Sequence, residues 1–315
     1  MDDEVNVTYV TLGGHVDMDK YRYVYFVIMF TAYIFIICCN STIVYLIWIH
    51  QNLHEPMYIF IAALLINSVL FSTTIYPKLL IDFLSDKQII SYSACLFQFH
   101  VFYSLGGSEF LLLAAMAYDR YVSICKPLQY PTVMTKTTVS IFLLFAWILP
   151  AAQVAVPAVL GAHKKLCRFI LNGIFCNNRV YKLHCVISES YIIRDLIILI
   201  NLALLPVLFI LFTYTRILII SYRSRREVRR KAAQTCLPHL IVLINFSCLC
   251  AYDVIIIRLE SDIPKPVRLI MTLQVVLYTP LFNPLIYGLK MKEISKHLKK
   301  LFCPAKMNQC LTTDN

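Results

Sequence analysis

Three groups of polar residues lie inside long apolar stretches of the sequence, where a polar side chain is costly and marks a functional site by default. The first group is the adjacent acid and base Asp119 and Arg120 in the string MAYDRYVSIC, which Lys126 and Pro127 follow. An isolated pair of this kind usually just ends a membrane span, with the long arginine side chain reaching the lipid headgroups. Here the surrounding string is more specific, and it indicates a site.

The second group is the string NPLIY at 283–287, near the end of the last apolar stretch. Pro284 removes one backbone hydrogen bond and weakens a helix at that point. Asn283 can pair with the groups that the proline frees, and Tyr287 can move if the helix bends. A static proline kink, which is common in membrane helices, is the alternative.

The third group is the single acid Glu109, about three helical turns before Arg120. A carboxylate in the middle of a membrane must face other helices and be protonated, paired or bound to a cation. A structural hydrogen bond to Asn40 or Asn283 and a regulatory proton or sodium site therefore remain equally open.

No catalytic residues can be assigned from the sequence. It contains no GxSxG, HExxH or P-loop string, and His163, His184 and His239 each stand alone. We therefore expect a protein that is not an enzyme and that has no cofactor and no metal centre.

The elements that carry these residues are seven unbroken apolar runs. Hydrophobic residues make up 59% of the 315 residues, charged residues 15%, and the mean hydropathy is +0.68. Unbroken runs of about 20 residues predict membrane-spanning helices, whereas a membrane β-barrel would alternate apolar and polar residues. We predict an all-α, seven-transmembrane bundle over 24–289, after an N-terminal segment 1–23 and before an amphipathic helix and tail over 290–315. The predicted spans are 24–48, 57–83, 96–124, 138–160, 192–220, 236–257 and 267–289.

The distribution of charge predicts the orientation of the bundle. Arginines and a lysine crowd the segment 223–231 after the fifth run, and lysines fill the tail, whereas the chain begins with Asp2, Asp3 and Glu4. The positive-inside rule then places the N-terminus outside and the tail in the cytoplasm. The net charge of +11 indicates contact with anionic membrane lipid rather than nucleic acid. The first span is the expected signal anchor, and Asn6 begins the one glycosylation sequon that fits this topology.

Four of the twelve cysteines are expected on the outer side: Cys95, Cys167, Cys176 and Cys185. An even number on the oxidising side predicts disulfides, and four cysteines leave three pairings open. A zinc site is the weaker interpretation, because the residues do not form a clustered tetrahedral set. Cys303 follows a basic amphipathic stretch, where palmitoylation and a free thiol are both open.

Several strings together resemble the rhodopsin-like G-protein-coupled receptors, and among them the odorant receptors. The resemblance covers nearly the whole chain, and the second span and its loop look most similar to fish odorant receptors. The strings that carry it are LHEPMY at 53–58, PKLL at 77–80, MAYDRYVSICKPLQY at 116–130, KAAQTCLPHL at 231–240 and PLFNPLIYGLK at 280–290.

The resemblance implies a function and roles for residues. The protein would reside in the plasma membrane, bind an odorant and activate a stimulatory, olfactory-type G protein that raises cyclic AMP. A rhodopsin-like receptor for a non-olfactory small molecule is the alternative; a transporter is disfavoured because no internal repeat is visible. The implied disulfides are Cys95–Cys176 and Cys167–Cys185. The implied activation switch comprises Asp119, Arg120, Tyr121, Tyr214, Asn283, Pro284 and Tyr287, and Pro206 would shape the fifth span.

The resemblance places the odorant in the outer half of the bundle. Helical spacing back from Arg120 puts four residues of the third span on or near that wall, and six residues of the fifth and sixth spans are candidates opposite them. The adjacent glycines of the third span either enlarge a pocket or allow close helix packing. The candidates are Phe102, Tyr103, Gly106, Gly107, Ile198, Leu199, Leu202, Ser247, Ala251 and Tyr252.

The sequence departs from the family pattern at three places. Ser68 stands where relatives usually carry an aspartate that helps to hold sodium, a role that Glu109 would have to take over. Phe246, Ser247 and Cys248 replace an aromatic pair followed by a small residue, so the usual tyrosine toggle is missing. The start of the sixth span offers Arg229 and no acid to hold Arg120, which implies either high basal activity or a different latch.

Overall fold

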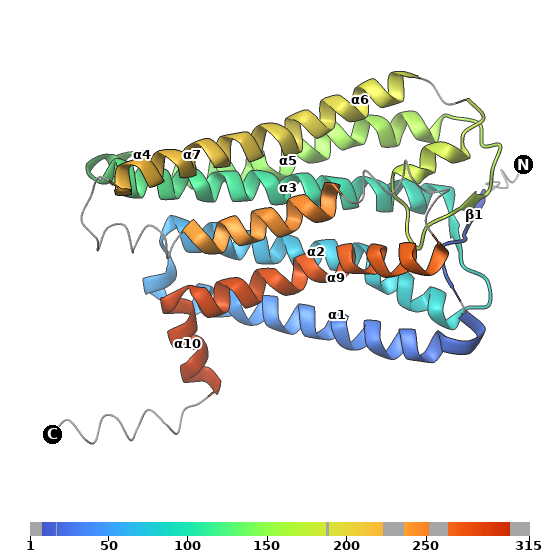
Figure 1. Ribbon diagram of the computed structural model, residues 1–315, viewed down its shortest axis with the longest axis horizontal. Helices are drawn as coiled ribbons and strands as arrows, with labels where there is room; N and C mark the ends of the chain where they lie inside the picture. Colours follow the sequence, from blue (N-terminus) through green and yellow to red (C-terminus); the bar gives the residue numbers. More distant parts are fainter. Residues whose placement is uncertain (1–7, 17, 187–188, 223–235, 252–263, 303–315) are drawn as a thin grey trace, which may run out of the picture.

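The computed structural model describes residues 8–16, 18–186, 189–222, 236–251 and 264–302. These residues form a bundle of long helices with a small β-sheet at one end (Figure 1). The long helices are α1 (Met18–Ile49), α2 (Pro56–Leu84), α3 (Tyr92–Cys125), α5 (Lys136–Ala162), the continuous run of α6 (Glu189–Leu199), η4 (Ile200–Leu204) and α7 (Leu205–Tyr222), the helix Cys236–Ala251, and α9 (Lys265–Lys290).

The prediction of a seven-transmembrane helix bundle is confirmed. Within the described residues, six helices are long and apolar enough to cross a membrane, and the seventh is described over Cys236–Ala251. A helix satisfies its backbone hydrogen bonds internally, which is why an unbroken apolar run becomes a helix in lipid. Large apolar side chains such as Trp48, with 73% of its surface exposed, point outward from the bundle, where lipid is the solvent that accepts them.

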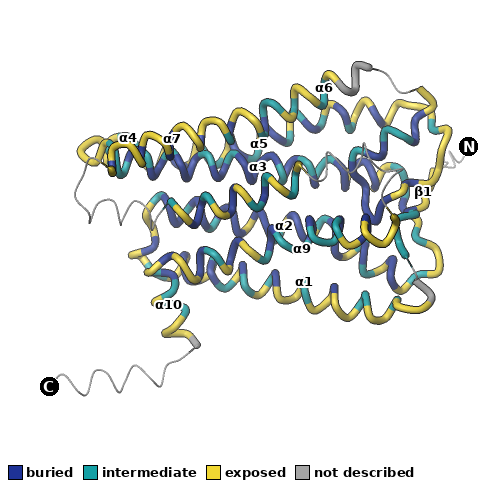
Figure 2. Tube along the Cα trace, viewed as in Figure 1, coloured by how far each residue is buried: buried dark blue, intermediate teal, exposed yellow. Residues whose placement is uncertain are grey.

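Helix α3 runs through the centre of the bundle and packs against α2, α5 and α7 (Figure 1). It is largely buried, whereas the outer faces of α1, α5 and α7 are exposed (Figure 2). Its N-terminus is capped by Ser91, whose hydroxyl accepts a hydrogen bond from the Ala94 amide. The predicted site residues of α3 therefore face other helices along the whole length of the bundle.

The end of the bundle near the N-terminus is closed by a three-stranded sheet, and we call it the covered end (residues 8–16, 85–95 and 164–186). Strand β1 (Tyr9–Leu12) lies between β2 (Ile89–Ser91), with which it pairs antiparallel, and β3 (Ile170–Leu171), with which it pairs parallel. The predicted N-terminal segment 1–23 thus contributes the middle strand of the cover. The cover also holds the 3-10 helix η3 (Asn178–Leu183).

The opposite end carries α10 (Lys292–Phe302), and we call it the α10 end. The expected amphipathic helix is present there and turns away from α9 (Figure 1). Ile294 is fully buried in the main apolar cluster, while Lys299 and Lys300 are exposed. Short helical turns join α1 to α2 and α3 to α5 at this end: η1 (Gln51–Leu53), η2 (Pro127–Gln129) and α4 (Tyr130–Val133).

The fifth span is interrupted by a turn of π-helix, η4, directly before Pro206. Proline has no backbone N–H and cannot continue the regular hydrogen-bond pattern, and π turns commonly absorb such a break. The wider turn places Leu202 inward, where 4% of its surface is exposed. Pro206 thus follows the irregular turn that shapes this span.

Candidate functional site

A cavity of about 380 Å³ lies between α3, α5, α6 and the helix Cys236–Ala251, toward the covered end. Its volume falls within the range of small-molecule sites, about 300–1,000 Å³. Aromatic and aliphatic side chains make up most of its wall. Seven of the ten predicted ligand-contact residues line it: Phe102, Tyr103, Gly106, Gly107, Ile198, Leu199 and Leu202.

The two adjacent glycines of α3 have different roles. A Cβ atom added at Gly106 would meet no atom within 4 Å, so this glycine leaves space in the cavity. A Cβ atom added at Gly107 would lie 2.9 Å from Leu202 Cδ1 and 3.0 Å from Pro150 Cβ. Both interpretations of the glycine pair are therefore correct, one for each residue: Gly106 enlarges the cavity and Gly107 permits close packing.

The sixth span presents a different face from the predicted one. Phe246 and Cys250 line the cavity, and Ser247 and Ala251 do not. The predicted pair lies one residue further along, which on a helix is a rotation of about 100° away from the cavity. Tyr252, the last predicted contact, lies outside the described residues.

The cavity roof is formed by η3, whose polar groups bond to both walls. The Asn178 amide donates to the Tyr103 hydroxyl at 3.2 Å, which ties the roof to α3. The Tyr181 hydroxyl donates to Asp195 Oδ1 at 3.2 Å, which ties it to α6. Burial and the neighbouring Asp195 carboxylate raise the pKa of Tyr181 well above its usual value of 10, so the phenol keeps its proton.

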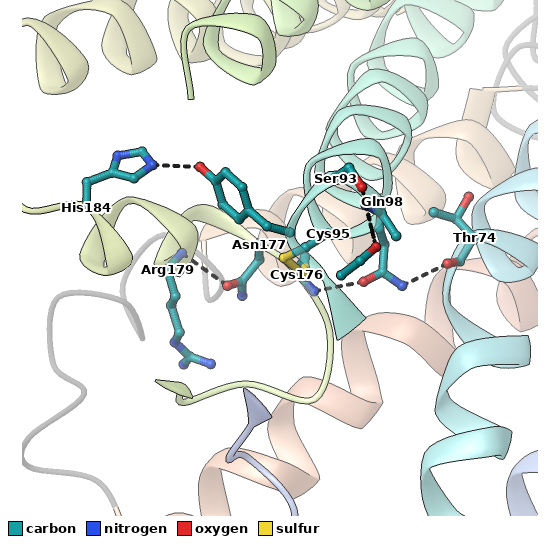
Figure 3. Close-up of a disulfide and its surroundings, with 11 residues drawn as sticks. Thr74, Ser93, Cys95, Gln98, Cys176, Asn177, Arg179 and His184 are labelled. Atoms are coloured by element: carbon teal, nitrogen blue, oxygen red, sulfur yellow. Dashed lines mark hydrogen bonds between the residues drawn. A yellow bond between two sulfur atoms is a disulfide. The ribbon is translucent and has the colours of Figure 1, made fainter. Parts of the chain in front are cut away.

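The roof is also held covalently, because the Cys95–Cys176 disulfide joins it to α3 (Figure 3). Beside this disulfide, Gln98 bridges two elements: its Nε2 donates to the Thr74 carbonyl and its Oε1 accepts from the Cys176 amide, each at 2.9 Å (Figure 3). This glutamine side chain, 5% exposed as a residue, locks α2, α3 and the roof in one arrangement.

The second disulfide, Cys167–Cys185, closes a shorter loop in the same cover. Both pairings that the family resemblance implied are thus present. Next to Cys185, His184 Nε2 lies 2.9 Å from the Tyr92 hydroxyl, which donates to the Gly161 carbonyl. Burial, followed by the charge of Lys164, lowers the pKa of His184 below its usual 6.5, so the ring stays neutral near pH 7.

Below the cavity, the buried carboxylate of Glu109 joins three helices. Its Oε1 accepts from Asn283 Nδ2 of α9 at 2.7 Å, and its Oε2 accepts from Asn67 Nδ2 of α2 at 3.0 Å. Asn283 also donates to the Ser68 hydroxyl at 2.9 Å, and Trp147 donates to Asn67 Oδ1 at 3.3 Å. Of the two expected amide partners, Asn283 is present and Asn40 is not; a proton or sodium role for Glu109 stays a prediction.

The proline of the NPLIY string leaves a backbone carbonyl of its own helix without a partner. A residue other than the expected Asn283 donates to that carbonyl. Because Pro284 has no N–H, the carbonyl of Pro280 loses its helical partner. Asn40 Nδ2 of α1 donates to this carbonyl at 3.0 Å. Asn283, which we expected in this role, instead holds Glu109, because its side chain projects toward α3 rather than back along its own helix.

At the α10 end, Arg120 is paired with its own neighbour. Arg120 Nε lies 2.9 Å from Asp119 Oδ2, and its Nη2 contacts the same oxygen. The other oxygen, Asp119 Oδ1, accepts from the Tyr130 hydroxyl of α4 at 2.8 Å. Tyr121 lies half-buried against the apolar core and takes no part in this pairing. The acid that holds Arg120 is therefore Asp119; Arg229 lies outside the described residues.

Two further tyrosines of the predicted switch lie close to this ion pair. The fully buried Tyr287 hydroxyl is 3.3 Å from His239 Nδ1 of the sixth span. Tyr214 is also buried, and its hydroxyl has no hydrogen-bond partner within the described part of the chain. A buried hydroxyl without a partner costs free energy, which is regained if the helices move to supply one.

The sequence analysis missed four residues of these clusters: Asn67, Tyr130, His239 and Asp195. His239 was dismissed as a lone histidine, although an ionisable side chain within an apolar span, inside a string already singled out, was a usable signal. Asp195 carried the same signal, and Asn67 carried the related signal of a polar amide within an apolar span. No sequence signal identified Tyr130, because it lies outside the predicted spans and only the folded structure brings its hydroxyl to Asp119. No group of three or more metal-ligating side chains is found in the described ranges.

Comparison with known proteins gives the same family over nearly the whole chain. The family described as "Olfactory receptor" matches residues 29–305. Three human relatives illustrate the similarity. Olfactory receptor 13C2 is 34% identical over 303 residues, covering 92% of each chain. Olfactory receptor 11H2 is 34% identical, covering 86% of this chain and 83% of its own, and olfactory receptor 11A1 is 32% identical, covering 94% of each.

Proposed function

Because this chain belongs to the olfactory receptor family of G-protein-coupled receptors, we propose that it is an odorant receptor of the plasma membrane coupled to a stimulatory, olfactory-type G protein. The family is one of receptors and not of enzymes. The ligand site in this proposal is the cavity beneath η3, and the signal is a rise in cyclic AMP. The observation that carries the proposal is a largely apolar cavity toward the covered end together with the buried Asp119–Arg120 ion pair at the α10 end.

The proposed orientation puts the covered end outside the cell and the α10 end in the cytoplasm. Two disulfides lie at the covered end, and disulfides persist in oxidising surroundings. Exposed lysines of α10 lie at the opposite end, as the positive-inside rule requires of cytoplasmic segments. The predicted glycan at Asn6 lies outside the described residues and would be external in this orientation.

In the proposed mechanism, an odorant shifts an existing equilibrium between closed and open bundles by binding the open form more tightly. Phe246 lines the cavity and packs on Phe110 of α3, with ring centroids 4.7 Å apart. His239 lies two helical turns from Phe246 on the same helix and contacts Tyr287. A ligand that moves Phe246 would therefore change the His239–Tyr287 contact at the α10 end.

Opening of the α10 end would release Arg120 from Asp119 and allow it to meet the G protein. In this proposal the buried Tyr214 and Tyr287 hydroxyls supply new partners once the sixth span moves. The Glu109 cluster joins α2, α3 and α9 between the two ends, so it transmits movement of one helix to the others.

The test is cyclic AMP in cells that express the chain with an olfactory-type G protein, with and without an odorant panel. The test variant is Arg120→Ala, and the matched control is Arg22→Ala, which removes an arginine at the covered end that pairs with the exposed Asp86. We expect a ligand-dependent rise that Arg120→Ala abolishes and Arg22→Ala retains, at equal surface expression.

Two results would contradict the proposal. No response to any odorant despite verified surface expression would reject the assigned G protein. An unchanged response in Arg120→Ala would reject the switch, since the ion pair would then play no part in coupling. Antibody access to an N-terminal epitope in intact cells tests the orientation separately.

A further inference from the structure

One wall of the cavity carries a formal charge. Among the described residues that line it, Asp195 of α6 is the only charged one, and the others are apolar or neutral. Arg194, the next residue along the helix, does not line the cavity. A ligand in the cavity thus meets a carboxylate and no cation from the described wall.

The Asp195 carboxylate can accept a hydrogen bond from a further donor. Its partners in the described chain are the Tyr181 hydroxyl at 3.2 Å and Arg194 Nη2 at 3.7 Å, both directed to Oδ1. An ionised carboxylate only accepts hydrogen bonds and offers about four lone-pair positions. Arg194 lies within ion-pair distance and balances part of the Asp195 charge, but both contacts fall on Oδ1, which leaves Oδ2 to accept from a ligand.

Aromatic rings surround the same end of the cavity. Phe99 packs on Tyr103 and on Tyr181, with ring centroids 4.9 Å and 5.8 Å apart. All three residues line the cavity. The Tyr181 ring already attracts a cation, because Arg194 Cζ lies 6.0 Å from its centroid. Aromatic faces next to a carboxylate form the environment in which organic ammonium groups are bound most strongly.

Building on the proposed function, we propose that the ligand class of this cavity is a protonated primary or secondary amine with an apolar body. The ammonium group donates to Asp195 beneath the Phe99, Tyr103 and Tyr181 rings. The apolar body extends along α3 into the space left by Gly106, toward Phe246.

The alternatives fit less well. A carboxylate ligand would face Asp195 with like charge in an apolar cavity, where repulsion is poorly screened. A neutral alcohol can donate to Asp195, but it carries no charge and so lacks the Coulombic attraction that an ammonium gains in a poorly screened cavity. A hydrocarbon would leave the carboxylate without a new donor while shielding it from water.

The experiment measures binding directly on the purified full-length receptor in detergent, so that it does not depend on the G protein. The probes are hexylamine, 1-hexanol and hexanoate, and also hexyltrimethylammonium, which keeps the charge without an N–H group. Dissociation constants come from ligand-dependent thermal stabilisation. The variant is Asp195→Asn, which preserves shape and removes the charge. The control is Asp86→Asn, which removes a carboxylate that is 90% exposed in the same half of the molecule.

We expect hexylamine to bind at least about tenfold more tightly than 1-hexanol, with hexanoate weakest. Asp195→Asn should weaken hexylamine by about tenfold or more and change 1-hexanol by less than about twofold, while Asp86→Asn changes neither. The affinity that hexyltrimethylammonium retains, relative to hexylamine, would measure how much the aromatic rings contribute to binding.

Equal affinity for the amine and the alcohol, or unchanged hexylamine binding in Asp195→Asn, would overturn the proposed ligand class. Absence of binding by all four probes to folded receptor would overturn it as well. The cyclic AMP measurement separates this failure from failure of the receptor function: neutral odorants that raise cyclic AMP through Arg120 would leave that function standing. Amine binding without any cyclic AMP response would instead retain the ligand class and reject the assigned coupling.

Discussion

The two ends of the bundle are held together by different kinds of interaction. At the covered end, two disulfides, a three-stranded sheet and the Gln98 bridge fix the roof over the cavity. At the α10 end, side-chain contacts hold the helices: the Asp119–Arg120 pair, the Tyr130 hydroxyl and the His239–Tyr287 contact. The first set includes two covalent bonds and a backbone ladder, whereas the second consists of side-chain contacts that can exchange partners.

In the proposed function, this difference would let one chain both bind an odorant and change its conformation. A rigid roof keeps the cavity preformed, so little free energy is spent on ordering it when a ligand binds. Side-chain pairs of modest strength at the other end leave a second arrangement within a few kcal/mol, which ligand binding can then favour.

The largest effect is expected from removing a disulfide at the covered end. Cys95→Ser opens a covalent link between residues 81 apart in sequence, and the chain-entropy estimate for a loop of this length is about 4–5 kcal/mol of free energy of unfolding. Cys167→Ser opens a link of 18 residues and should cost about 3 kcal/mol. Thermal unfolding of purified receptor measures both. Equal losses, or a larger loss for Cys167→Ser, would contradict the view that the longer link is the main tie of the roof.

The next effect comes from the two glycines under the roof. Gly107→Ala places a methyl group against Leu202 and Pro150 and should cost about 1–3 kcal/mol through overpacking. Gly106→Ala meets open space and should gain up to about 1 kcal/mol from helix propensity while it narrows the cavity. Thermal unfolding measures the change in stability of both variants, and ligand affinity measures the narrowing of the cavity. The assignment of one packing and one cavity glycine fails if the two variants behave alike.

A smaller effect is expected at the α10 end, and it should appear in signalling rather than in folding. Tyr130→Phe removes one hydrogen bond to the Asp119 carboxylate, worth about 1–2 kcal/mol to the closed state, and should raise basal signalling by about 5- to 30-fold. Tyr214→Phe removes a hydroxyl that has no partner in the described closed state, so basal signalling should not rise and the ligand response should fall. Both are read as G-protein activation at equal surface expression. A raised basal signal in Tyr214→Phe would show that the closed state uses this hydroxyl.

The smallest effect concerns pH and the covered end. The pKa of His184 is held below 6.5 in the fold, chiefly by burial, so below about pH 6.5 the unfolded chain binds a proton that the folded chain does not. The free energy of unfolding should therefore decrease as the pH falls below this value, and His184→Gln should decrease less. Thermal unfolding between about pH 7.5 and pH 5.5 tests this. His163→Gln, which removes an exposed histidine near the same end, is the matched control.

Much of the site was predictable wherever a residue's position follows from its own helix. Spacing back from Arg120 correctly placed Phe102, Tyr103, Gly106 and Gly107 on the cavity wall, because α3 is regular and central. On the sixth span the predicted Ser247 does not line the cavity and Phe246 does, because the rotation of one helix against another depends on packing and not on its own sequence.

The sequence by itself determined that this chain crosses the membrane in seven helices, since unbroken apolar runs have no other stable state in lipid. Its strings also determined the family. Only the tertiary structure decided the partners of the buried polar groups. Asn40 donates to the Pro280 carbonyl. Glu109 accepts from Asn67 and Asn283, and Asp195 accepts from Tyr181 of the roof. A buried polar group needs a partner, but residues far apart in the chain can supply it, and only the packed bundle sets which of them lies within hydrogen-bonding distance.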